Sequence, residues 1–124
     1  MFDKDYVANK FYGNHIELTE SLTFTGEGYS VRVPTGFLSD GTTNQGMHHI
    51  IRKFGPSLRA SVVHDYLTTK GSLGVTLPTG NLYRPNWPRA ADIYGECLKS
   101  CGFGRIKIGL IVSGVKLYGK LKRY

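Results

Sequence analysis

One segment in the middle of the chain gathers short polar side chains of types that can move protons or bind ions. At about 100° per residue, four of them fall on one arc of a helix, and the opposite arc is aliphatic and aromatic. The four residues are Ser61, His64, Asp65 and Thr68. An ordinary solvated helix face carries mostly Lys, Glu and Gln, so this composition predicts a lined pocket. The alternative is that the helix backbone and a neighbouring loop satisfy these side chains.

A loop rich in Gly, Asp, Asn and Thr precedes this helix. It covers residues 35–45 (TGFLSDGTTNQ) and includes Asp40. Such residues favour turns and offer oxygen ligands. We therefore expect Asp40 to contribute to the same pocket.

Other possible sites are weaker. His48 and His49 are neighbours, and adjacent helical positions point about 100° apart, so we do not expect them to share a metal ion with His15. The segment around Asn86-Trp87-Pro88 mixes aromatic and basic residues, a pattern compatible with stacking on single-stranded bases. A buried Trp that anchors the segment is the interpretation that we favour.

The positive charge of the chain is concentrated near its end. The net charge is +7, and no acidic residue follows position 104. The basic contact surface that we predict there comprises Arg105, Lys116, Lys120 and Arg123. Such a surface suits nucleic acid, an anionic lipid surface or an acidic protein, although a solvated helix face would have the same composition.

The two cysteines and the apolar segments limit the class of protein. Cys97 and Cys101 stand one helical turn apart, where a disulfide would be strained, so we expect two small core residues in a reducing compartment. We expect no secretory signal in the first residues, MFDKDYVANKFYG. The apolar run 106–118 is too short for a transmembrane helix.

The pattern of the 124 residues predicts a single α+β domain, 1–124, with a small antiparallel N-terminal sheet against three to four C-terminal helices. Alternation from Ile16 to Phe24 and from Tyr29 to Val33 predicts a hairpin. An exposed loop or a small hairpin follows, with short strands possible around residues 73–77 and 82–83. Helices are expected at residues 47–54, 57–69 with Ser57 as N-cap, 89–101 and 105–122.

Four separated motifs carry a resemblance to a known family. They are VPTGFLSDGTT, ASVVHDYL, RAAD before a helix, and VKLYG in the last helix. In this order they resemble a phage-associated domain of unknown function family (1353), over roughly residues 30 to 119. The resemblance implies a phage or prophage origin, a place in the host cytoplasm or the virion, and other phage proteins or further copies of the chain as partners.

The His-Asp pair also resembles that of calcium-dependent phospholipases of the A type. The resemblance implies that His64 acts as the base, while Asp65 and Asp40 hold calcium. Two positions depart from that pattern. Thr68 occupies the place of a Tyr, and Asp92 is one residue out of register with the supporting carboxylate, so we predict that Asp92 faces solvent.

These observations lead to one expected function and two alternatives. We expect a phage-encoded accessory or virion structural protein, not a catalyst, with a polar His64 pocket, no required cofactor and a basic C-terminal helix as its contact surface. The first alternative is a calcium-dependent lipid or ester hydrolase. The second is a nucleic-acid-binding module.

Overall fold

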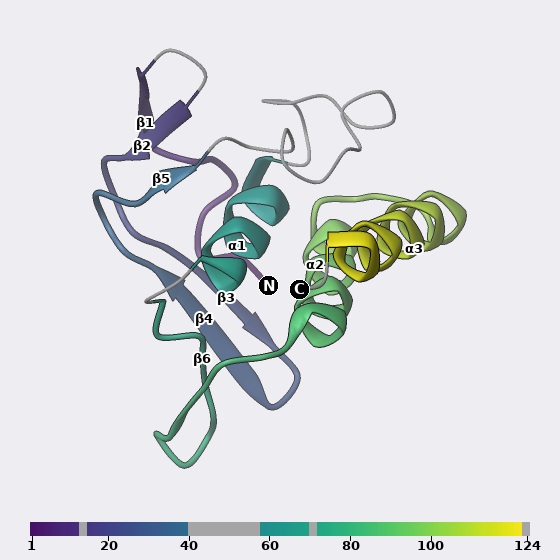
Figure 1. Ribbon diagram of the computed structural model, residues 1–124. Helices are drawn as coiled ribbons and strands as arrows, with labels where there is room; N and C mark the ends of the chain where they lie inside the picture. Colours follow the sequence, from purple (N-terminus) through teal and green to yellow (C-terminus); the bar gives the residue numbers. More distant parts are fainter. Residues whose placement is uncertain (13–14, 40–57, 70–71, 123–124) are drawn as a thin grey trace.

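The computed structural model describes residues 1–12, 15–39, 58–69 and 72–122. It confirms the α+β class: antiparallel sheets form the N-terminal half and three helices lie toward the C-terminal end (Figure 1). The helix predicted for residues 47–54 lies outside the described residues. So does Ser57, the predicted N-cap of the next helix.

The predicted hairpin is present as β3 (Leu22–Gly26) and β4 (Tyr29–Val33). Its strands are antiparallel and pair Phe24 with Val31. The side chains alternate between buried and more exposed positions because one face of the pair packs on the core. Gly28, with φ of 81°, supplies the left-handed residue of the connecting turn.

The expectation that the first strand of this hairpin starts at Ile16 is wrong. Ile16 lies in β2 (His15–Leu18), which belongs to a separate sheet with β1 (Asn9–Tyr12) and β5 (Leu38–Ser39). The chain bends after Leu18, whose N–H donates to the carbonyl of Phe37 and whose carbonyl accepts from Gly36. These backbone bonds hold the strand in the second sheet, a pairing that apolar alternation alone does not reveal.

The short strands predicted after the first helix form a hairpin, β6 (Val75–Thr76) and β7 (Leu82–Tyr83). Thr76 of β6 pairs with Ser30 of β4, so the sheet has four strands in the order β3-β4-β6-β7. Leu82 is exposed, whereas Val75 is buried. The hairpin therefore extends the sheet and adds only a small part of its own surface to the core.

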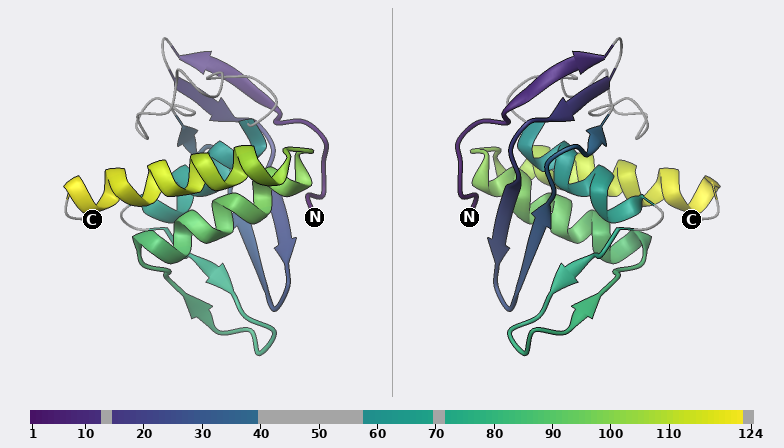
Figure 2. Two further views of the ribbon diagram at one scale, coloured as in Figure 1. Left: turned by 90° about the vertical axis from the view of Figure 1, so that its right-hand side faces the viewer. Right: turned by 90° about the vertical axis from the view of Figure 1, so that its left-hand side faces the viewer.

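Three helices follow the predicted boundaries closely. They are α1 (Leu58–Thr68), α2 (Trp87–Ser100) and α3 (Arg105–Lys122). The second begins two residues earlier than predicted because the Asn86 side chain accepts a hydrogen bond from the N–H of Arg89 and caps the helix. Both views in Figure 2 place α3 across α2, on the side away from α1 and the sheets.

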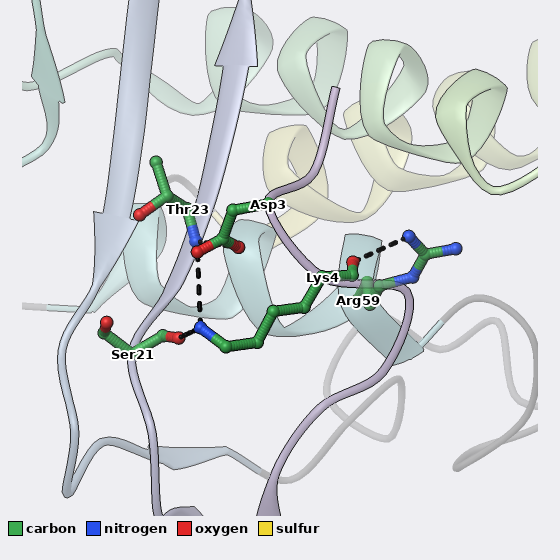
Figure 3. A network of polar contacts seen from close by, with 5 residues as sticks. All are labelled: Asp3, Lys4, Ser21, Thr23 and Arg59. Atoms are coloured by element: carbon green, nitrogen blue, oxygen red, sulfur yellow. Dashed lines mark hydrogen bonds and ion pairs between the residues drawn. The ribbon is translucent and has the colours of Figure 1, made fainter.

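The N-terminal segment is held against both β3 and α1 (Figure 3). Asp3 accepts a hydrogen bond from the N–H of Thr23 at 3.0 Å, and Lys4 donates to the carbonyl of Ser21 at 2.8 Å. Arg59 of α1 donates to the carbonyl of Lys4 at 3.1 Å. The segment therefore connects the edge of the sheet to the first helix.

The inner face of α2 agrees with the sequence analysis. Ile93, Tyr94, Cys97 and Leu98 are buried, and Cys101 is half-buried. Neither cysteine forms a disulfide, as predicted. Burial raises the pKa of the Cys97 thiol well above its usual range, so the thiol stays protonated and packs as a small apolar side chain.

Trp87 joins α2 to α3. Its side chain is buried, as predicted, and its indole N–H donates to the carbonyl of Val115 at 2.7 Å. Its ring lies so close to Gly119 that an added Cβ there would come within 1.9 Å of the indole Cδ1 and Nε1 atoms. Position 119 therefore has no room for any side chain.

We expect Gly119→Ala to lower the free energy of unfolding by about 2 kcal/mol, because the methyl group must displace the buried Trp87 ring. Urea denaturation measures the change. The matched control is Gly109→Ala in the same helix, where no atom lies within 4 Å of the added Cβ. That control should gain about 0.5–1 kcal/mol from helix propensity. Equal effects of the two substitutions would contradict the prediction.

Candidate functional site

The structure separates the four polar residues of α1 by depth. Ser61 and His64 are completely buried, whereas Asp65 and Thr68 are half-buried. The helix is covered on the side that carries His64 as well as on its aliphatic side, since Ala60, Val63 and Tyr66 are buried too. The polar arc is therefore divided: Ser61 and His64 lie in the interior, and Asp65 and Thr68 lie nearer the surface.

His64 lies between two aromatic rings. Its imidazole meets the Trp87 ring edge-on at a centroid distance of 5.1 Å and the Tyr94 ring at 4.9 Å with a tilt of 33°. Burial lowers the pKa of His64 to about 3, because water cannot solvate the charged imidazolium there. At neutral pH the imidazole is uncharged and packs as an aromatic side chain.

The hydroxyl groups of Ser61 and Thr68 have polar partners within the protein. Ser61 Oγ and the Tyr94 hydroxyl lie 3.3 Å apart, and burial raises the pKa of Tyr94 to about 12. Thr68 Oγ1 donates to the carbonyls of His64 and Asp65 at 3.1 and 3.2 Å. Groups within the protein therefore satisfy these hydroxyl groups, as in the alternative to a lined pocket.

The predicted calcium ligands are described only in part. Asp65 lies on α1, whereas Asp40 lies outside the described residues. Within the part of the chain that is described, no three His, Cys, Asp or Glu side chains come together as a metal site would require. The calcium site stays a prediction.

Asp92 points away from the imidazole, as predicted. Its carboxylate forms an ion pair with Lys116 of α3 at 2.8 Å, and 47% of its side chain is exposed. The supporting acid expected for a phospholipase-like histidine is therefore on the outer surface of α2. In this position it connects two helices and does not reach His64.

The predicted basic surface lies on α3. Arg105, Lys116 and Lys120 are exposed, and Arg123 lies outside the described residues. Sequence reasoning missed a row of aliphatic side chains beside these cations. Each of them is between 56% and 84% exposed. We call this row the α3 seam: Ile106, Leu110, Leu117 and Leu121.

A signal for the seam was present in the sequence. Its members are four, seven and four residues apart, which keeps them on one line of a helix. A second line, containing Ile111 and Val115, is buried against the body of the protein. The helix has two apolar lines on opposite sides, and one helix can present only one of them to its own core.

A groove of about 500 Å³ lies between α2 and the start of α3. It is lined by Gly95 and Glu96 of α2 and by Arg105, Ile108 and Val112 of α3, among others. The side of the protein formed by α2 and α3 therefore combines aliphatic and charged surface.

The chain belongs to a family of proteins of unknown function. A family model described as "Protein of unknown function (DUF1353)" matches residues 16–115, which include most of β2, then β3 to β7, α1, α2 and α3 as far as Val115. No curated protein and no solved structure matches the chain. Among the described residues, no helix is long and apolar enough to cross a bilayer.

The buried imidazole makes stability depend on pH. The unfolded chain binds a proton at His64 below about pH 6.5, while the folded chain resists protonation until about pH 3. The unfolded state thus binds more protons in this window, so His64 costs stability as the pH falls from 6.5 toward 3. We expect His64→Gln to flatten this decline by about 1 kcal/mol per pH unit, as measured by urea denaturation at pH 4 to 7.

The control for the pH experiment is His15→Gln, since His15 is an exposed histidine at the start of β2. This variant should keep the pH dependence of the unchanged protein. If His64→Gln also kept it, the imidazole would have to be accessible to protons in the folded state.

Proposed function

We propose that the chain is a phage-encoded accessory or virion structural protein that acts by contact with other proteins and not by catalysis. The phage origin rests on the sequence motifs, and the contact role rests on the geometry of α1 and α3. No cofactor is required for this role.

The observation that carries the proposal is the environment of His64. A general base must reach the proton that it removes and must have a pKa near the working pH. His64 is 0% exposed, is enclosed by Trp87 and Tyr94, and has a pKa lowered to about 3. Its environment suits a packing role and opposes a catalytic one.

The outer side of α3 supports the contact role. Proteins seldom leave a row of large aliphatic side chains in water without a use for it. The α3 seam is such a row, and the cations of the same helix lie beside it. Nucleic acid is the alternative ligand for these cations, but Lys116 is already paired with Asp92, and aliphatic side chains contribute little to phosphate binding.

A complementation experiment separates contact from catalysis. In a phage genome from which the gene has been deleted, we expect His64→Gln to restore the yield of infectious particles at temperatures where the variant is folded. The double variant Leu110→Lys plus Leu117→Lys changes only exposed seam residues, so it should fold and fail to restore the yield. The opposite pattern, with His64 essential and the seam dispensable, would refute the proposal.

The hydrolase alternative makes a separate prediction about calcium. A protein that binds calcium only when folded gains stability as calcium rises. We expect 5 mM calcium to leave the Tm unchanged from its value in EDTA, as measured by differential scanning calorimetry. A rise that is abolished by Asp65→Asn but not by the surface control Asp92→Asn would favour the hydrolase.

A further inference from the structure

We propose that the α3 seam docks an amphipathic helix of another protein, and that this partner helix carries Asp and Glu beside its own aliphatic row. The inference rests on the contact role proposed above and adds the chemistry of the partner. It follows from the position, the width and the flanking charges of the seam.

The seam faces away from the body of the protein. The opposite side of α3 is buried on α2 and on the Trp87 ring, through Ile111, Val115 and Gly119. In Figure 2 the helix forms the outermost layer beyond α2. The aliphatic side chains of the seam therefore stand on an open surface along most of the helix.

The width of the seam favours a helix over a bilayer as its partner. Its four side chains lie within an arc of roughly 60°, calculated from 3.6 residues per turn. A narrow line of this kind is typical of the seam between two paired helices, whereas a broader apolar face is typical of a helix that lies on a core or a membrane. Halfway along the seam, just outside the two edges of this arc, stand Ser113 and Gly114, whose small size lets a second helix approach closely.

The charges beside the seam favour an acidic partner. Lys116 is already paired with Asp92 of α2, which leaves Lys107 on one flank of the seam and Lys120 on the other. Residues flanking the line of contact between two helices decide which partners pair, through opposite charges. Asp and Glu on the partner would meet these lysines, and basic residues would repel them.

A second copy of the chain is the nearest competitor. The order of the seam is symmetric, so that two antiparallel copies would place Ile106 against Leu121 and Leu110 against Leu117. Both copies, however, would bring Lys107 and Lys120 to the contact, and the acid beside this flank, Asp92, is already paired with Lys116. This repulsion disfavours self-pairing and leaves the seam of a single copy open for an acidic helix.

The test uses two synthetic helical peptides as probes. Both carry a leucine row with the spacing of the seam; one has Glu and the other has Lys at the flanking positions. We expect the full chain to bind the fluorescein-labelled Glu peptide saturably in an anisotropy titration, at least ten-fold more tightly than the Lys peptide. The double variant Lys107→Glu plus Lys120→Glu should reverse this preference.

Matched leucine variants locate the binding surface. Leu110→Gln plus Leu117→Gln should weaken binding of the Glu peptide at least ten-fold. The control, Leu73→Gln plus Leu82→Gln, removes two leucines of similar exposure, 62% and 57%, outside α3 and should bind as the unchanged chain does. Circular dichroism of each variant verifies that it is folded.

Three results would overturn the inference. The first is equal binding of the two peptides, or no binding of the Glu peptide at 100 µM. The second is a stable dimer of the chain in light scattering that the seam variant dissociates. The third is seam-dependent binding to vesicles with 30% phosphatidylglycerol that exceeds binding of the Glu peptide. If any of these occurs while complementation still depends on the seam, the contact role stands and only the helical partner is wrong.

Discussion

The helical half of the protein depends on the packing of Trp87. This one side chain donates a hydrogen bond to the backbone of α3, fills the space above Gly119 and forms one wall around His64. It therefore connects α1, α2 and α3 at a single point. The orientation of α3, and with it the direction of the seam, follows from this contact, because Gly119 allows the indole to approach the helix backbone directly.

The burial of His64 follows from the same contact. A buried imidazole is uncharged when the energy of transferring its charged form out of water exceeds what its contacts in the interior return. Between Trp87 and Tyr94 the residue contributes area and shape. A His-Asp pair on a helix, which in another environment would indicate proton transfer, here belongs in part to the packing of the core.

Local patterns predicted much of the fold. The hairpin around Gly28, the C-terminal end of α2 and the bounds of α3 follow from turn residues and apolar spacing, which act over a few positions. The start of α2 was predicted two residues too late, because the capping role of Asn86 was not identified from the sequence. The division into two sheets was not predicted, because it depends on backbone bonds between Leu18 and Phe37. Alternation of side chains is identical whether a strand continues or changes partner.

The candidate site was also predicted only where local features decide the position of a residue. Helical spacing placed Asp92 on the outside correctly, since its position on α2 is a local property. It could not show that Ser61 and His64 are covered, because the covering rings come from another helix. The seam was missed for a related reason: α3 is apolar on two sides, and only the tertiary structure shows which side Trp87 and α2 occupy.

The lysines beside the seam have a colloidal consequence as well. With a net charge of +7, copies of the protein repel one another at neutral pH. This repulsion opposes aggregation through the exposed side chains of the α3 seam. The protection weakens toward the isoelectric point near 9.5 and in concentrated salt, where the charge is neutralised or screened. The solubility of the purified protein therefore depends on the charges beside the α3 seam, the surface that the proposed partner helix would cover.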